Sequence, residues 1–229
     1  MAMDTISQAS VPHVHIIRHG QALHNIIRDT KIRDPPLTSQ GHDSTQRITL
    51  PVEPDVIVIS PMTRTIQTAL NMFPFLKEPG PWPIPVEIWP DLRETFDSEC
   101  NKGLPRSELS LKYPQFDYSK CNENWDYPSH TIESATARAE SVRKRLKELS
   151  TTHLNIAVIT HRGFVGFLVK GRRFDTAETR TYRFATDEET QDSAIRQGIN
   201  CDTLLAQDFG PTVLVLEKEA NVDVITSLS

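Results

Sequence analysis

The chain has 229 residues, of which 38% are hydrophobic and 24% are charged, and its formal net charge is −5 at pH 7. This length suffices for one α/β domain over residues 1–229, and the composition excludes a largely disordered chain. The acidic balance excludes a general nucleic-acid binder, which shows a basic field. No stretch has the length and apolarity of a membrane span or a signal segment, so we expect a soluble, cytoplasmic protein with neither nucleic acid nor membrane among its partners.

The cysteines, at positions 100, 121 and 201, are few and lack the spacing of metal ligands. We therefore expect neither a disulfide framework nor a zinc site. A reduced compartment fits this pattern, and we expect no metal and no cofactor.

The first half of the chain alternates between predicted strands and helices. The β-branched run from His13 to Ile17 predicts a buried strand, and "QALHNIIRDT" behind it predicts a short helix. Thr38 is the expected N-cap of a second helix. Further elements continue the alternation: a strand over 55–59, a helix over 62–73 and a strand over 86–88.

The second half supplies the remaining elements. Apolar side chains recur at helical spacing from Ile132 to Leu149, which predicts an amphipathic helix whose basic side, with Arg138 and Arg143, is solvated. The run "NIAVIT" predicts the next buried strand, and later elements follow: a helix over 163–169 and strands over 181–184 and 212–217. Strands alternating with helices predict an α/β fold, a three-layer α/β/α sandwich with a mainly parallel central sheet.

Residues 90–130 interrupt this alternation, because the hydrophobic period is lost there. Aromatic side chains gather in the segment: Tyr113, Phe116, Tyr118, Trp125 and Tyr127. A long segment without strong secondary structure is usually a lid or binding loop, and a surface excursion packed by its own aromatics is the alternative. Glu94 at its entrance favours a cap insertion over the C-terminal strand ends.

Reactive side chains follow three of the predicted strands. The first strand stops at Arg18-His19-Gly20, Arg64 comes shortly after the second strand, and His161 directly follows "NIAVIT". The carboxyl ends of parallel strands meet at one edge of a sheet, so we expect these side chains to lie together. Two forked guanidinium groups beside two imidazoles are suited to chemistry on an anion.

Four segments resemble the motifs of the histidine phosphatase superfamily, also called the phosphoglycerate mutase-like family. They are Arg18-His19-Gly20, Ser60-Pro61-x-x-Arg64-Thr65-x-Gln67-Thr68, Leu92-x-Glu94 and Thr160-His161-x-Gly163. Three further segments are similar to the fungal phosphomutase-like branch: Leu23-His24-Asn25, Asp34-Pro35-Pro36-Leu37-Thr38 and Cys100-x-x-Gly103. The resemblance covers most of the chain.

The resemblance implies that His19 is the nucleophile, which becomes a phosphohistidine, and that His161 donates to the transferring phosphoryl group. Arg18 and Arg64 then bind phosphate oxygens, and Asn25 adds a neutral donor. The two guanidinium charges also oppose protonation of the His19 imidazole, which keeps its lone pair available near neutral pH.

By the same resemblance, Glu94 protonates the leaving oxygen and later takes a proton from the water that cleaves the phosphohistidine. Such use of one carboxyl group requires a pKa near the working pH, which partial burial under the cap would provide. Asp97 and Glu99 lie close in sequence and are rivals for the role.

Two positions depart from the family pattern. Arg162 stands where the family usually has a small residue, and four more arginines follow at 172, 173, 180 and 183. These arginines extend a positive pocket towards a second carboxylate or phosphate, or they cover a solvated face. His24 stands where the glycolytic mutases of the family carry tryptophan, and it contacts substrate or serves helix capping and packing.

The sequence therefore predicts a metal-independent phosphohydrolase, a phosphomonoesterase of the histidine acid phosphatase type, that acts on a small phosphorylated or otherwise anionic metabolite. One alternative is a non-catalytic interaction module. Another is a non-hydrolytic enzyme of fungal specialised metabolism that has recruited the same anion pocket. The sequence leaves open whether two copies form a homodimer.

Overall fold

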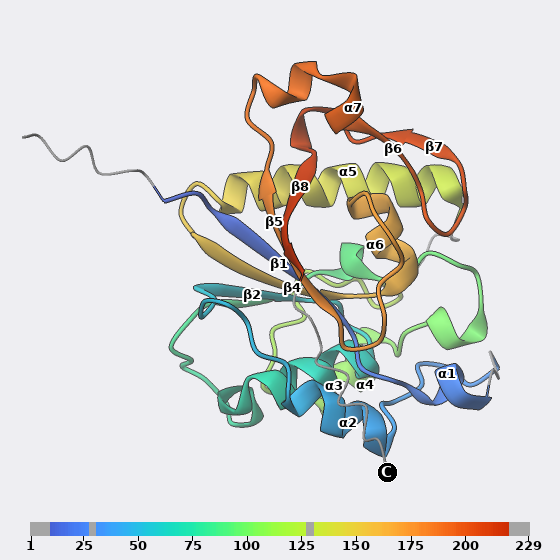
Figure 1. The fold of residues 1–229 in the computed structure, drawn as a ribbon. Helices are drawn as coiled ribbons and strands as arrows, with labels where there is room; N and C mark the ends of the chain where they lie inside the picture. Colours follow the sequence, from blue (N-terminus) through green and yellow to red (C-terminus); the bar gives the residue numbers. More distant parts are fainter. Residues whose placement is uncertain (1–9, 28–30, 127–130, 220–229) are drawn as a thin grey trace, which may run out of the picture.

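The computed structural model describes residues 10–27, 31–126 and 131–219, so Tyr127 lies outside the described residues. Six strands form the main sheet in the order β3-β2-β4-β1-β5-β8 (Figure 1). Their bounds are β1 His13–Arg18, β2 Val56–Ile59, β3 Val86–Ile88, β4 Asn155–Thr160, β5 Thr179–Phe184 and β8 Leu214–Glu219. Strands β1 to β4 pair in parallel and β5 pairs antiparallel with β1 and β8, so the sheet is mainly parallel.

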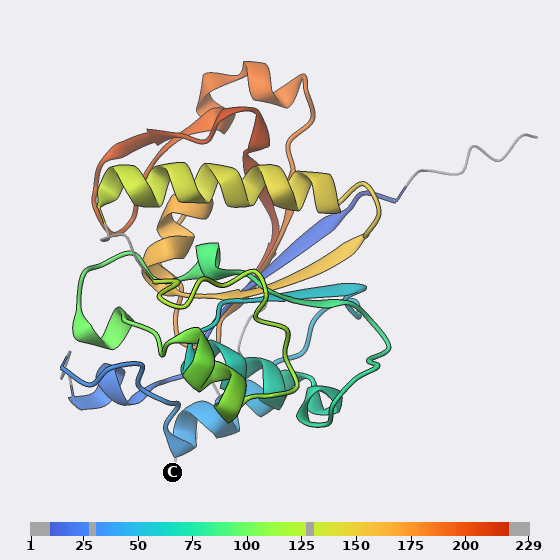
Figure 2. The same ribbon diagram turned by 180° about the vertical axis from the view of Figure 1, so that it is seen from behind.

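Helices cover both faces of the sheet (Figures 1 and 2). One face carries α5 (Ile132–Leu149) and α6 (Arg162–Leu168), and the other carries α2 (Ser39–Gln46), α3 (Thr63–Met72) and α4 (Arg106–Lys112). Successive side chains of a buried strand point to opposite faces. Val58 accordingly packs into the core beside α5, and Ile57 into the core beside α3. These three layers confirm the predicted fold class.

Most predicted elements are present, with shifts at their ends. The helix α5 has the predicted bounds, and Thr38 caps α2 by accepting a hydrogen bond from the Gly41 N–H. The strands β5 and β8 each begin two residues away from the predicted start. The hairpin of β6 (Gln197–Ile199) and β7 (Ala206–Asp208) beside α7 (Ser193–Arg196) was not predicted, because such short, half-exposed strands show no clear alternation.

The basic side of α5 differs from the prediction of a solvated face. Arg138 and Arg143 are both buried. Arg143 donates to the Phe167 carbonyl at 2.8 Å, and the Arg138 guanidinium stacks 4.4 Å from the ring centre of Phe164. The apolar side of α5 contains small side chains such as Ala135 and Ala139, which leave room for these long side chains to reach inward.

Residues 90–126 combine the two alternatives that the sequence left open. The later part holds α4, and its aromatic side chains pack into the core beside α3: Tyr113, Phe116, Tyr118 and Trp125. The earlier part contains a 3₁₀ turn over Glu99–Asn101 and contacts the end of β4, where the Thr160 hydroxyl donates to the Leu92 carbonyl at 2.8 Å. Within the described ranges, no helix has the length and apolarity required to span a membrane.

Candidate active site

The register of the parallel strands brings the predicted site residues together. Arg18 is paired with Thr160 at the end of β1 and β4, and Ile59 with Ile159 at the end of β2. The next residues along the chain are His19, Ser60 and His161, so they meet at the carboxyl edge of the sheet. The ring centres of His19 and His161 are 5.3 Å apart, and Ser60 Oγ lies 2.8 Å from His161 Nε2.

The His19 imidazole is held in one tautomer. Its Nδ1 lies 2.7 Å from the Gly20 carbonyl oxygen, which can only accept a hydrogen bond. Nδ1 therefore carries the proton and Nε2 carries the lone pair. Arg64 Nε donates a hydrogen bond to this Nε2 at 3.3 Å, so the lone pair is directed at the Arg64 guanidinium.

Burial and positive charge keep the imidazoles of the site neutral. Burial, then the charges of Arg64 and Arg18, lower the pKa of His19 well below 6.5. Burial and Arg64 do the same for His161, and they lower the pKa of His24 to about 3. A neutral imidazole retains the lone pair that a nucleophile requires, as the sequence predicted for His19.

The depressed pKa values of His19 and His161 predict a loss of stability in acid. Below pH 6.5 the unfolded chain binds protons at these positions and the folded chain does not, so stability is present above that pH and is lost as the pH falls. As the pH falls below 6.5, each group should lower the free energy of unfolding progressively, with a limiting slope of about 1 kcal/mol per pH unit. The free energy of unfolding, measured with denaturant at several pH values between about 7 and 5, should fall less steeply with pH for His161→Asn than for the wild type. An unchanged slope would contradict this assignment.

Arg64 lies in the first turn of α3 and is fully buried. Asp34 fixes that helix end, because its carboxylate accepts hydrogen bonds from the Thr63 N–H at 2.9 Å and the Thr63 hydroxyl at 2.7 Å. The guanidinium donates to the Cys100 carbonyl at 3.0 Å and to Asn101 Oδ1 at 3.2 Å. Arg64 therefore contacts both the candidate nucleophile His19 and the segment that contains Cys100 and Asn101.

Arg18 lies at the end of β1 and is held from the loop between α6 and β5. Its Nη1 donates to the Phe174 carbonyl at 2.7 Å, while its buried Nε has no hydrogen-bond partner among the described residues. Burial, then the charge of Arg162, lower the pKa of Arg18 to about 10. It remains a cation at neutral pH.

The Glu94 carboxylate lies at the beginning of α6. Oε1 accepts hydrogen bonds from the N–H groups of Thr95 and Phe164, both at 2.9 Å, and Oε2 accepts one from Gly163 at 3.2 Å. A Cβ atom at Gly163 would collide with Oε1 and with the Thr95 hydroxyl oxygen, so a larger residue there would displace these side chains. The negative charge of Glu94 acts on both Arg18 and Arg64, which places this carboxylate at the site.

The two rivals of Glu94 lie differently. Asp97 is exposed. Glu99 forms an ion pair with Lys102 at 2.9 Å. Of the three carboxylates, Glu94 is therefore the one that the fold holds between the helix end and the arginines.

Asn25 and His24 lie on α1 (Leu23–Ile27) and contact each other. Asn25 Oδ1 accepts from the Ala22 N–H at 2.9 Å, and its Nδ2 lies 3.1 Å from His24 Nε2. The ring centre of His24 is 6.0 Å from that of His19. The Asn25 amide thus supports His24 in this structure, and His24 is the member of the pair that borders the nucleophile.

Arg138 on α5 supports the segment that carries Glu94, a contribution that sequence reasoning missed. Its Nη1 donates to the carbonyls of Asp91 and Arg93 at 2.8 and 2.6 Å, and its Nη2 to that of Glu94 at 3.2 Å. Its position among alanines on the apolar side of α5 is the one sequence signal. Ser60, the partner of His161, was also missed, although it stands at a strand end inside a motif.

The arginines that follow His161 have separate surroundings. Arg162 and Arg173 both approach Asp202. Arg172 and Arg180 both bind Glu178, and Arg180 is fully buried rather than solvated. In the register of β1 and β5, Arg183 lies opposite His13, at the end of β1 that is remote from the site. Of the five arginines, only Arg162 and Arg173 therefore stay candidates for an extended positive pocket among the described residues.

The described residues hold no group of three or more His, Cys, Asp or Glu side chains that could bind a metal ion.

Comparison with known proteins identifies the family. Residues 14–192 match the profile of the histidine phosphatase superfamily (branch 1), and this range includes His19, Arg64 and His161. The chain belongs to this superfamily. A "probable phosphatase" of Schizosaccharomyces pombe (strain 972) is 30% identical over 124 residues, which are 50% of this chain and 56% of that protein. The match thus spans about half the length of this curated relative.

Solved structures share the fold. The α-ribazole phosphatase from Shigella flexneri superposes with a TM-score of 0.52 at 20% identity, over 76% of this chain and 91% of that chain. The product of an open reading frame from Mycobacterium tuberculosis superposes with a TM-score of 0.51 at 15% identity, over 77% of this chain and 93% of that chain.

Proposed function

We propose that the protein is a phosphohydrolase that cleaves a small phosphorylated metabolite through a phosphohistidine at His19. The observation that carries this proposal is the tautomer of His19, whose Nδ1 is 2.7 Å from the Gly20 carbonyl and whose Nε2 faces Arg64. The family of the chain and the phosphatase name of its relative support the same activity.

In the first step, His19 Nε2 attacks phosphorus, and the bond between phosphorus and the ester oxygen breaks. Glu94 gives a proton to the leaving oxygen. In the second step, Glu94 takes a proton from water, the water oxygen attacks phosphorus, and the phosphorus–nitrogen bond breaks. Inorganic phosphate leaves, and both residues return to their initial protonation states.

Arginines and His161 stabilise the charge that develops on the phosphoryl oxygens. Arg64 lies beside the attacking nitrogen, and Arg18 offers its unpartnered Nε. His161 Nδ1 is buried and has no hydrogen-bond partner within the described part of the chain. When the Ser60 hydroxyl donates to His161 Nε2, Nδ1 carries the proton and donates to the phosphoryl group.

Because these groups supply positive charge and donors, we propose that the reaction needs no divalent cation. A cytoplasmic location is part of the same proposal. It rests on the three free cysteines, of which Cys100 and Cys121 are buried.

Phosphate release from a panel of phosphomonoesters and diphosphates tests the proposal, with the pH varied from mildly acidic to neutral. We expect release that is inhibited by vanadate and unaffected by a chelator, and the pH profile decides whether the acid phosphatase type applies. Complete loss with a chelator would contradict metal independence. No release by folded wild-type protein would contradict the hydrolase, and would favour the interaction module or the recruited enzyme.

A further inference from the structure

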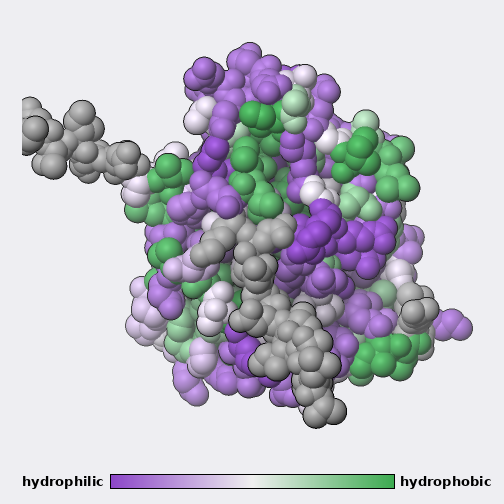
Figure 3. Space-filling view, viewed as in Figure 1, coloured by the Kyte–Doolittle hydropathy of each residue, from purple (hydrophilic) through white to green (hydrophobic). Residues whose placement is uncertain are grey.

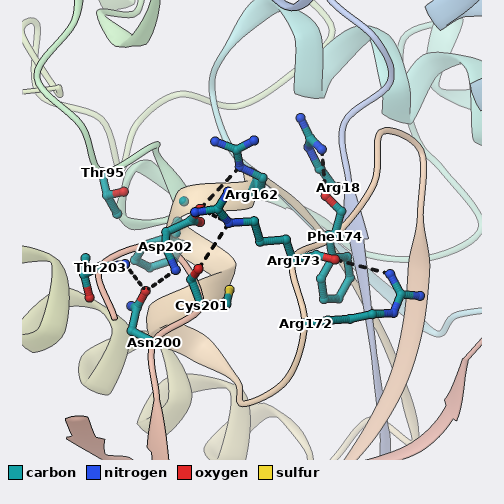
Figure 4. A network of polar contacts seen from close by, with 12 residues as sticks. Arg18, Thr95, Arg162, Arg172, Arg173, Phe174, Asn200, Cys201, Asp202 and Thr203 are labelled. Carbon is teal, nitrogen blue, oxygen red and sulfur yellow. Dashed lines mark hydrogen bonds and ion pairs between the residues drawn. The ribbon is translucent and has the colours of Figure 1, made fainter. Parts of the chain in front are cut away.

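Two arginines at the edge of the candidate site share one buried carboxylate (Figure 4). Arg173 Nε lies 2.8 Å from Asp202 Oδ1, and Arg162 Nε lies 3.7 Å from the same oxygen. Arg173 Nε also donates to the Cys201 carbonyl at 3.1 Å. Both contacts use the inner nitrogen of the guanidinium, and among the described residues no hydrogen-bond partner occupies the outer nitrogens of Arg162 or Arg173.

The carboxylate is fixed in place by the connection between β6 and β7. Asn200 is buried, and its Oδ1 accepts hydrogen bonds from the N–H groups of Asp202 and Thr203 at 2.9 and 3.0 Å. The Asp202 side chain is only 3% exposed, whereas those of Arg162 and Arg173 are 43% and 55% exposed. A buried carboxylate that contacts two partly exposed cations is thus built into this edge.

The charges at this edge do not balance. Two guanidinium groups meet one carboxylate at this edge, whereas Arg18 has the charges of Glu94 and Asp175 near it. Figure 4 shows the guanidinium groups of Arg162 and Arg18 pointing to the same side. The face over α6 and the segment after it is also strongly hydrophilic (Figure 3). An acidic group placed there would receive forked, charge-assisted hydrogen bonds.

The edge is continuous with the site of the proposed reaction. Arg162 directly follows His161, and Arg173 directly precedes Phe174, whose carbonyl holds Arg18. The charge of Arg162 also acts on both Arg18 and His24. A ligand with its phosphoryl group at His19 would therefore extend towards Arg162 and Arg173.

We propose that Arg162 and Arg173, positioned by Asp202, form a second anion subsite, and that the substrate is a phosphate monoester with a second acidic group. This inference rests on the phosphohydrolase function proposed above. The second group is a carboxylate or another phosphoryl group, because both accept the paired donors of a guanidinium fork. Asp202 acts as a positioning residue, since its contacts are with the two arginines.

Paired substrates test the subsite. One pair is 3-phosphoglycerate and glycerol 3-phosphate, which differ in a carboxylate, and the other is fructose 1,6-bisphosphate and fructose 6-phosphate, which differ in a phosphate. Wild-type protein should prefer the more acidic member of at least one pair, through KM, by about 10-fold or more. Arg162→Gln should lower that preference by about 10-fold, and Asp202→Asn should lower it in part.

The matched control is Arg196→Gln, which removes an arginine that pairs with Asp208 at 2.9 Å beside the same hairpin. It should leave the preference unchanged. A preference that is absent in the wild type, or equal in the wild type and Arg162→Gln, would overturn the subsite while phosphate release still supports the hydrolase.

Affinity measured by calorimetry keeps the subsite testable without turnover. In a His19→Ala background, adding Arg162→Gln should weaken binding of the more acidic member of the preferred pair by about 10-fold relative to its partner. That result without any phosphate release by the wild type would support the subsite and reject the hydrolase. Equal weakening of both members would reject the subsite.

Discussion

Replacement of His19 by alanine is expected to abolish phosphate release, with a loss in kcat of roughly 10⁴-fold or more. Removing the imidazole removes the nitrogen that attacks phosphorus. This nitrogen belongs to the imidazole on which the charges of both Arg64 and Arg18 act. Steady-state assays on the best substrate of the panel would measure the loss. The remaining cations would still bind substrate, so the affinity should fall much less than the rate.

A histidine outside the site provides the control for that variant. His153 lies in the turn between α5 and β4, where its ring contacts Thr152. His153→Ala should therefore retain wild-type turnover. Activity of His19→Ala within about tenfold of the wild type would contradict the role of His19 as nucleophile.

Glu94→Gln is expected to lower kcat by about 10²- to 10⁴-fold for alkyl phosphates. The variant keeps the size of the side chain and removes the proton that the leaving oxygen takes. With p-nitrophenyl phosphate, whose leaving group needs no proton, the first step should be nearly normal. Cleavage of the phosphohistidine should then limit the rate, and a burst of p-nitrophenol should precede slow turnover.

Two comparisons make the Glu94 result specific. Asp97→Asn and Glu99→Gln alter the rival carboxylates and should retain activity. Thermal unfolding of Glu94→Gln is also required, because both Glu94 oxygens accept backbone N–H groups. An amide there should cost about 1–3 kcal/mol of stability. Loss of activity in Asp97→Asn or Glu99→Gln, with Glu94→Gln active, would transfer the role to that rival.

The sheet and the centre of the site could be predicted because they depend on local patterns. The runs 13–17 and 155–160 are apolar and β-branched, which indicates buried strands. Parallel pairing then requires that His19 and His161 follow neighbouring strand ends. Arg64 could be placed as well, because it lies in the first turn of the helix behind another of these strands.

Other features depend on contacts between distant segments, which leave no local pattern. The burial of Arg138 requires carbonyl groups of residues more than forty positions earlier in the chain. Asp202 contacts Arg162 because it lies in a hairpin between β6 and β7. Each of these strands has three residues, which is too short to show an alternating pattern. The amide of Asn25 contacts His24, and only the conformation of α1 determines this.

The central claim is that a phosphoryl group passes through His19, and trapping that group tests it most directly. Glu94→Gln protein would be mixed with p-nitrophenyl phosphate, from which the phosphohistidine should form and accumulate, then quenched in alkali to preserve it, digested, and analysed by mass spectrometry. We predict one phosphoryl group on the peptide that contains His19, acid-labile and absent from protein that also carries His19→Ala. Phosphate release without any phosphoryl group on His19, or with the group on another residue, would contradict the mechanism.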